Sequence, residues 1–136
     1  MAAGRHVADV MLRFPRTHGP DTGLAEIREL FEDDHVHMAL IVTRDGRLLT
    51  TIERPDLADA LPDSGPAREV GTLAGRTAGP ADPLAATTAA LLRGRRRRLA
   101  VVGEYGQLLG LLCLSKDGTG YCSDDGVRAR KTAPRA

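Results

Sequence analysis

The sequence RTHGPDTGLA at residues 16–25 returns as RTAGPADPLA at residues 76–85, with each matching position 60 residues further along the chain. The same offset of 60 aligns residues 45–49 with residues 105–109, and no gap is needed between the blocks. A register kept over that length indicates an internal repeat. We therefore expect two copies of one supersecondary unit that pack together.

The composition is that of an ordinary globular chain. Its 136 residues suit one compact domain or two small halves with a shared core, and about 68% of the unfolded surface should become buried without a disulfide staple. The 19 basic and 18 acidic side chains nearly cancel, which argues against a dedicated nucleic-acid or membrane-surface protein. The chain has only two phenylalanines and two tyrosines, too few for the stacking platforms of a single-strand binder.

The two cysteines, Cys113 and Cys122, do not form a disulfide framework. Cys113 falls in an apolar, strand-like run, where a buried free thiol is expected. No apolar run approaches the ~20 residues of a membrane span, and the N-terminus lacks a signal-peptide core. We therefore expect a protein of the reducing cytoplasm, with no membrane contact.

The first copy is predicted to follow the order β-α-β-β-α. Apolar residues at helical spacing predict its first helix, alternation and apolar runs predict its strands, and an Asp-Gly pair predicts a hairpin. The expected elements are a helical or 3₁₀ turn within residues 7–12, an extended piece at 17–18, a helix from Asp21 or Thr22 to about Glu32, strands at 38–42 and 48–52, and a short helix that begins at 54–57.

The second copy repeats this pattern as far as Leu114. Asp82 is the expected cap and Pro83 the expected first residue of a helix that ends near Gly94, and two strands are expected at 99–102 and 108–112. The stretch PDSGP at 62–66 is the predicted boundary. The predicted organisation is repeat 1 at 7–62, a linker at 63–66, repeat 2 at 67–122, and a helix with a basic tail at 123–136.

Three motifs in this arrangement resemble a known family. The stretch VADVM at 7–11 looks like the "V-x-D-V-M" start of many first units of the CBS domain pair, or Bateman module, and THGPD at 17–21 looks like that family's "T-x-x-P-D" helix start. The stretch RRLAVV at 97–102, followed by Gly106 and 108–110, is similar to "H-R-L-P-V-V-D-x-x-G-x-L-x-G". The resemblance covers residues 7–114. It implies an α+β fold built from a tandem pair of β-α-β-β-α CBS repeats related by pseudo-two-fold symmetry.

The resemblance also implies a function. CBS pairs commonly act as regulatory sensors that bind AMP, ADP, ATP or S-adenosylmethionine in clefts between the repeats, and many form homodimers. We therefore expect a stand-alone regulatory module that binds an adenine nucleotide or S-adenosylmethionine, pairs with a second copy and acts on an unknown target protein. The alternative is an interaction or scaffold module whose ligand site is degenerate, because fold alone does not settle function.

The predicted ribose acceptor is Asp56. In the family a carboxylate that receives the ribose hydroxyls closes the pattern "G-x-x-S/T-x-x-D". The stretch TTIERPD at 50–56 keeps this aspartate but lacks the glycine and the hydroxyl residue, whereas GLLCLSK at 110–116 keeps the glycine and ends in Lys116. A lysine has no acceptor for a diol, so at most one standard site is expected. The competing interpretation of Asp56 is a charge at a helix start.

The predicted phosphate contacts are hydroxyl, histidine and arginine side chains, which the family places before the first helix and before the middle strand of each repeat. Arginine and histidine give charge-assisted bonds to phosphate. The adenine base would use the edges of the middle strands. The full predicted ligand-binding set is Thr17, His37, Ile41, Asp56, Thr77, Arg97, Arg98 and Val101.

Each of these side chains also has a structural interpretation. Thr17 and Thr77 can be turn residues that bond their own backbone, and His37 can lie at a strand edge. The run of arginines at 95–98 can stabilise a helix C-terminus, or contact nucleic acid, which is the least favoured function. His35 and His37 do not resemble a zinc-site spacing, and no catalytic motif is present. We therefore predict no metal, no catalytic residue and no enzyme.

Overall fold

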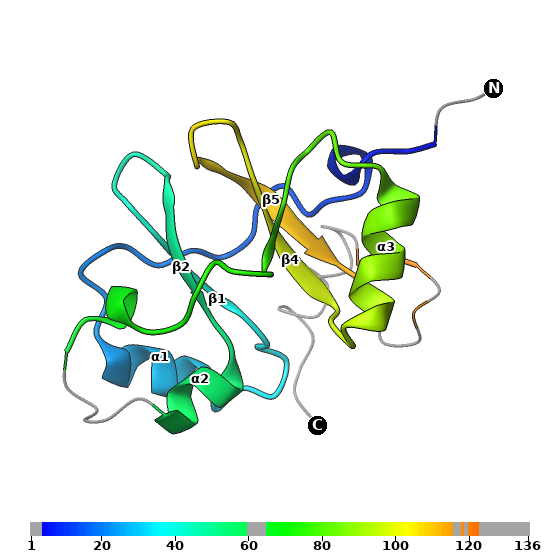
Figure 1. Cartoon of the computed structure of the whole chain (residues 1–136). Helices are drawn as coiled ribbons and strands as arrows, with labels where there is room; N and C mark the ends of the chain where they lie inside the picture. The colour runs from blue at the N-terminus through cyan, green and yellow to red at the C-terminus, as the bar shows by residue number, and fades with distance from the viewer. Residues whose placement is uncertain (1–3, 60–64, 116–117, 119, 123–136) are drawn as a thin grey trace. The chain divides into compact units, whose positions relative to one another are not determined.

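The computed structural model describes residues 4–59, 65–115, 118 and 120–122. The expected helix after Asp124 and the basic tail lie outside these residues. The elements in chain order are η1 (Val7–Asp9), α1 (Leu24–Leu30), β1 (Ala39–Val42), β2 (Leu48–Ile52), α2 (Arg54–Asp59), η2 (Ala67–Glu69), β3 (Thr77–Ala78), α3 (Leu84–Arg93), β4 (Arg98–Val102) and β5 (Leu108–Cys113) (Figure 1).

The fold is α+β, with a two-stranded sheet β1-β2 and a three-stranded sheet in the order β3-β4-β5. The chain divides into two compact units. The first-half unit contains residues 16–77 and 104–108, and the second-half unit contains residues 78–103 and the described residues from 109 onward, together with 4–15. No helix within the described ranges has the length and apolar character needed to cross a membrane.

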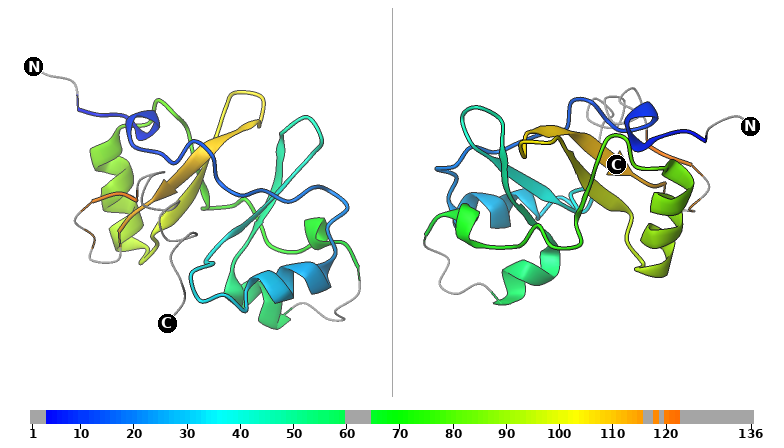
Figure 2. Two further views of the ribbon diagram at one scale, coloured as in Figure 1. Left: turned by 180° about the vertical axis from the view of Figure 1, so that it is seen from behind. Right: turned by 45° about the horizontal axis from the view of Figure 1, so that its top comes forward.

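The main-chain pairing confirms the repeat. In the second-half unit Leu12 pairs with Leu111, and in the first-half unit Thr72 pairs with Thr51. The offset of 60 converts the first pair into the second, with the two partners exchanged. A second matched set of bridges joins His6 to Pro83 and Gly23 to Pro66. The first residues of each predicted repeat therefore pack within the unit formed by most of the other repeat. Figure 2 shows the N-terminal segment beside β5.

The first-half unit is built on an amphipathic helix. Leu24, Ile27 and Phe31 recur at helical spacing in and just after α1 and are buried, as an apolar stripe on a core-facing helix requires. α1 and α2 lie side by side (Figure 1), where Arg28 Nη2 donates to Leu57 O at 2.9 Å. The buried cluster consists of Leu24, Ile27, Phe31, Ala39, Ile41, Ile52, Leu57 and Ala67.

The second-half unit has its own core between α3 and the strands β4 and β5. Leu84 and Leu91 supply the buried side of α3, whereas Leu92 is exposed. The buried cluster consists of Val7, Ala78, Leu84, Leu91, Leu99, Val101 and Leu112. The predicted strands and the order of elements are confirmed, because the apolar runs match the buried strands.

Both predicted helix caps are wrong by one or two residues. Gly23, rather than Asp21 or Thr22, is the N-cap of α1, and its N–H donates to Glu26 Oε1 at 3.3 Å. Pro83 is the N-cap of α3, and Asp82 instead accepts the N–H of Gly79 at 2.8 Å. In both cases a nearby carboxylate accepts a hydrogen bond from a main-chain N–H group. The capping rule alone does not predict this local bond.

α3 ends in a Schellman motif that contains an arginine at the glycine position. Gly94 is the C-cap, and Arg95 adopts the left-handed conformation with φ 55°. The N–H of Arg96 donates to Leu91 O at 2.9 Å, and that of Arg95 donates to Leu92 O at 3.2 Å. Glycine usually occupies this position because a side chain there costs about 1–2 kcal/mol.

Candidate functional site

The predicted ribose acceptor lies at the start of α2. Asp56 follows β2 in the first turn of this helix, and its Oδ2 accepts the N–H of Glu53 at 2.8 Å. Glu53 precedes the helix, so this bond is the half of a capping box in which the third helical residue reaches back to the cap. The Asp56 side chain is 19% exposed. The structural interpretation of Asp56, a charged residue that caps a helix start, is therefore confirmed.

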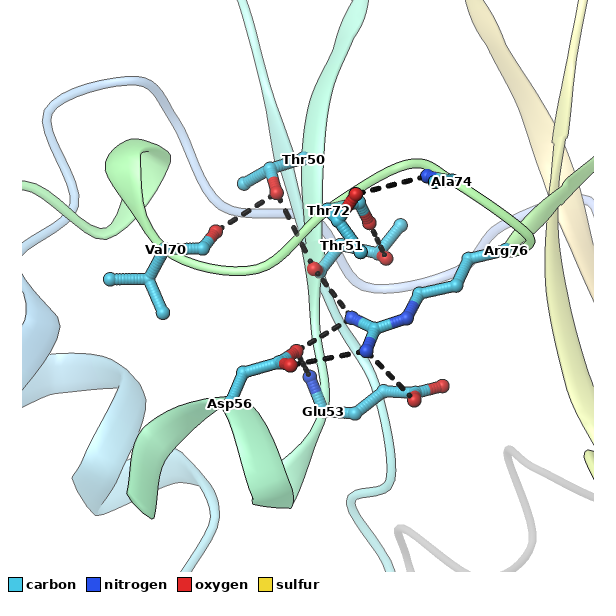
Figure 3. Close-up of polar contacts among 8 residues, drawn as sticks. All are labelled: Thr50, Thr51, Glu53, Asp56, Val70, Thr72, Ala74 and Arg76. Atoms are coloured by element: carbon cyan, nitrogen blue, oxygen red, sulfur yellow. Dashed lines mark hydrogen bonds and ion pairs between the residues drawn. The ribbon is translucent and has the colours of Figure 1, made fainter. Parts of the chain in front are cut away.

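The same carboxylate is bound by an arginine outside the predicted ligand-binding set. Arg76 Nη1 donates to Asp56 Oδ2 at 2.6 Å, and Arg76 Nη2 donates to Asp56 Oδ1 at 3.1 Å. This is the bidentate arginine–carboxylate geometry, which is among the strong charge-assisted contacts. Figure 3 shows the guanidinium between Asp56 and Glu53, whose Oε1 lies 3.3 Å from Arg76 Nη2.

Arg76 is held as a buried cation. Its side chain is 9% exposed, and Nη1 also donates to the carbonyl oxygen of Thr51 at 3.2 Å. The hydrogen bond to Asp56 raises the pKa of Arg76, and the charges of Glu53 and Asp56 act in the same direction, against the opposing effect of burial. The guanidinium therefore stays charged, and the two acids with one arginine carry one formal negative charge.

The segment before Arg76 is fixed to β2 by threonine side chains. Thr50 Oγ1 donates to Val70 O at 2.9 Å, and Thr51 Oγ1 donates to Thr72 O at 2.6 Å. The N–H of Thr72 donates back to Thr51 O at 3.1 Å. These bonds satisfy the two buried hydroxyls and carry the chain to the place from which Arg76 reaches Asp56 (Figure 3).

Gly71 allows the close approach of this segment to β2. Its φ is +84°, and a Cβ at this position would lie 2.0 Å from Thr51 O. Glycine is the residue that adopts a positive φ without strain and lets two backbones meet. Gly71 is therefore a structural requirement for the Arg76–Asp56 contact.

Four further predicted residues, Thr17, His37, Ile41 and Thr77, belong to the first-half unit. His18 pairs with Ile41 in β1, so Thr17 lies one residue before that bridge, and its side chain is exposed. His37 is exposed two residues before β1, Ile41 is completely buried, and Thr77 is half-buried directly after Arg76. Ile41 can therefore offer a ligand only its main chain.

The remaining three predicted residues belong to the second-half unit. Arg97 Nε donates to Leu114 O at 3.3 Å, and Leu114 N–H donates to Arg97 O at 2.7 Å. Arg98 begins β4 and is half-buried, whereas the side chain of Val101 is completely buried. The ligand-binding roles of all eight residues stay predictions.

The sequence contained a signal for the acidic cluster. The repeat keeps arginine at both 16 and 76, but the offset of 60 aligns Glu53 with Cys113 and Asp56 with Lys116. Only the first copy therefore offers two carboxylates to an arginine. Within the described part of the chain, no group of three or more His, Cys, Asp or Glu side chains could hold a metal ion.

Sequence comparison with known proteins gives no match. No protein-family profile matches the chain. No curated protein sequence matches it either.

Solved structures identify the fold. The cystathionine beta-synthase (CBS) pair domain of a putative Mg²⁺ transporter from Shewanella oneidensis MR-1 is 18% identical, has a TM-score of 0.71, and covers 96% of this chain and 74% of its own. CBSX2 in complex with AMP is 19% identical with a TM-score of 0.68, and the match covers 94% of this chain and 97% of CBSX2. A CBS domain pair in complex with 5′-methylthioadenosine and S-adenosyl-L-methionine is 20% identical with a TM-score of 0.61, and the match covers 79% of this chain and 92% of that one. The chain has the fold of a CBS domain pair.

Proposed function

We propose that this chain is a regulatory CBS-pair module that senses an adenosine-containing ligand, and that Asp56 accepts the ribose hydroxyls of that ligand. The observation that carries the proposal is the placement of Asp56: its carboxylate is fixed after β2 by the N–H of Glu53 and remains partly exposed. A carboxylate is the acceptor that a diol needs. The AMP complex of CBSX2 and the S-adenosyl-L-methionine complex of the other CBS pair support this class of ligand.

Arg76 sets a condition on this binding. Both Asp56 oxygens accept hydrogen bonds from the guanidinium, so a diol that binds in a bidentate manner requires Arg76 to release at least one of them. The hydroxyls are neutral donors, so their bonds to the carboxylate lack the ion-pair attraction of the guanidinium bonds that they replace. We therefore expect the adenine base and the phosphates to supply most of the affinity.

The proposed phosphate contacts are Thr17, Thr77 and Arg98, and His37 and Arg97 are the further basic residues of the proposed set. Thr17 is exposed, and Thr77 and Arg98 are half-buried, so each retains some solvent accessibility. A ligand with more phosphates gains more from arginine. ATP and AMP should therefore differ in affinity, whereas S-adenosylmethionine, which has no phosphate, should depend on Asp56 and on the contacts of its adenine base.

A thermal-shift panel tests the proposal. AMP, ATP and S-adenosylmethionine are added to the wild-type chain and to Asp56→Asn, with ribose 5-phosphate as the adenine-free control. A ligand at 100 times its Kd stabilises the folded chain by about 2.7 kcal/mol, which gives a clear rise in Tm. The proposal predicts this rise in the wild type and a clearly smaller rise in Asp56→Asn at the same ligand concentration. No rise with any adenosine compound contradicts it.

The Arg76–Asp56 contact favours one alternative function. If the buried guanidinium is a permanent partner of the carboxylate, the chain is an interaction module without a nucleotide. The bidentate geometry and the 9% exposure of Arg76 support this reading. The variant Arg76→Gln separates the two functions. In a sensor it should raise the affinity for adenosine ligands, whereas in an interaction module no ligand should change the Tm.

We also propose that the chain works as a homodimer in the cytoplasm, where it acts on a target protein. The resemblance to CBS pairs supports the pairing of two copies. The two free cysteines, Cys113 and Cys122, support a reducing compartment. Sedimentation velocity across a range of concentrations tests the dimer, and a single monomeric species at every concentration contradicts it.

A further inference from the structure

The described end of the chain pairs with the end of β5. Leu114 and Tyr121 are antiparallel partners. The N–H of Ser115 donates to Gly120 O at 2.7 Å, and the N–H of Cys122 donates to Cys113 O at 2.7 Å. These two bonds flank the Leu114–Tyr121 pair, so the register is fixed and Cys113 stands directly opposite Cys122.

This register meets the spacing of a disulfide. Directly opposed residues of an antiparallel pair have Cα atoms about 4.5–5.5 Å apart and carry their side chains on the same face, and disulfides join Cα atoms about 4.4–6.8 Å apart. Both cysteines are free, and the Cys122 thiol lies near enough to Cys113 to raise the pKa of the Cys113 thiol. The two sulfur atoms therefore lie together before any bond is formed.

Tyr121 holds the segment in this register. Its ring packs against the core of the second-half unit, and its hydroxyl makes a hydrogen bond with the hydroxyl of Thr88 on α3. Cys122 follows directly. The opposition of the two thiols is thus supported by a side-chain anchor as well as by the main chain.

We propose that Cys113 and Cys122 are a site of reversible oxidation, at which a low-molecular-weight disulfide converts the two thiols into an intramolecular disulfide. The two cysteines differ in access: Cys113 is 3% exposed, whereas Cys122 is half-buried. Burial, together with the neighbouring Cys122 thiol, raises the pKa of Cys113 to about 11. Cys122 is therefore the thiol that reacts first, because reactivity follows thiolate character and exposure.

The reaction proceeds by two thiol–disulfide exchanges. The Cys122 thiolate attacks one sulfur of the small disulfide, forms a mixed disulfide and releases one small thiolate. Cys113 Sγ then attacks Cys122 Sγ, the second small thiol leaves, and the released thiolate takes the proton of Cys113. Two protein thiols are oxidised and one small disulfide is reduced to two thiols. The positive charges of Arg98 and Arg97 partly offset the rise in the pKa of Cys113, and they favour the thiolate that develops on it.

The product would tie residues 120–122 covalently to β5. The six residues between Leu114 and Tyr121 follow the second hairpin strand of repeat 2, the position at which repeat 1 carries Asp56. Oxidation would therefore fix residues 120–122 beside the end of β5. This site is independent of nucleotide binding.

The test is oxidation of the whole wild-type chain with oxidised glutathione, followed by trypsin digestion and mass spectrometry without reductant. Cleavage after Arg98, Lys116 and Arg128 places the cysteines in separate peptides, 99–116 and 117–128. The proposal predicts these two peptides joined by a disulfide, and their separation by dithiothreitol. A stable glutathione adduct on Cys122, a disulfide between two chains, or unreacted thiols overturns it.

Two serine variants provide matched controls. In Cys113→Ser the mixed disulfide cannot be resolved, so a glutathione adduct should persist on Cys122. In Cys122→Ser the remaining thiol is buried and should react at least tenfold more slowly. Equal reaction of the two variants contradicts the assigned order. Because the joined peptides are measured in the wild type, the proposal can be refuted even if a variant fails to fold.

Discussion

The contact between Arg76 and Asp56 gives the sharpest prediction about the structure. We consider the replacement Arg76→Met, which keeps the apolar stem of the side chain and removes the guanidinium. Three contacts are lost: the bidentate pair with Asp56, the ion pair with Glu53 and the bond to Thr51 O. The variant should therefore unfold at a lower urea concentration than the wild type.

The expected loss follows from burial. Removal of one partner from a fully buried ion pair costs about 3–5 kcal/mol, and exposed pairs contribute about 0–1 kcal/mol. Arg76 is 9% exposed, and the carboxylates of Asp56 and Glu53 are 19% and 20% exposed. Because water can partly solvate the two carboxylates that remain, we place the loss near the lower end of the buried range, at about 3 kcal/mol.

The assay is urea unfolding at fixed pH for the wild type, Arg76→Met, Asp56→Asn and the double variant. The double-mutant cycle should give a coupling free energy of about 2 kcal/mol. Arg44→Met is the matched control, because its ion pair with Asp21 is exposed, with side chains 88% and 77% accessible, and its loss should cost less than about 0.5 kcal/mol. If Arg76→Met costs no more than Arg44→Met, the reasoning about the buried cluster is refuted.

Three further predictions concern the backbone and pH. Gly71→Ala should destabilise by about 3 kcal/mol or more in urea unfolding, because its Cβ would lie 2.0 Å from Thr51 O at a φ of +84°; a neutral result contradicts the close approach. Arg95→Gly should raise the unfolding free energy by about 0.5–1 kcal/mol, since the left-handed strain exceeds the entropy that glycine adds; a loss of stability contradicts this. Burial lowers the pKa of His18 in the folded chain below 6.5, so the unfolded chain takes up a proton at His18 more readily. The free energy of unfolding should therefore fall as the pH drops below 6.5. In His18→Gln this contribution to the slope of the unfolding free energy against pH should be absent, and an unchanged slope would exclude His18 as its source.

The repeat made most of the fold predictable. Its offset of 60 and the apolar runs located β1, β2, β4 and β5, and the Asp-Gly turn located the first hairpin. The helix starts were less predictable, because Glu26 and Asp82 bond main-chain donors near the caps and such local competition is invisible in periodicity. The first residues of each repeat pair with the strands of the other repeat, as Leu12 does with Leu111 and Thr72 with Thr51. This pairing arises in three dimensions, and no local sequence pattern encodes it.

The site was only half predictable. Asp56 could be found because the family pattern marks its position, but its partner could not, because Arg76 lies 20 residues away on a segment without apolar alternation. The contact depends on Gly71 and on two buried threonines of β2. Thr50 departs from the family glycine, and in this chain its hydroxyl helps to hold the segment that carries Arg76.

The central claim is that Asp56 binds the ribose of an adenosine-containing ligand. The most direct measurement is isothermal titration of AMP into the wild-type chain and into Asp56→Asn, with circular dichroism to show that the variant is folded. Loss of a charged acceptor should weaken binding at least tenfold, about 1.4 kcal/mol. The account predicts saturable heat in the wild type and this weakening in the variant. Equal affinity in the two chains, or no binding by the wild type, contradicts it.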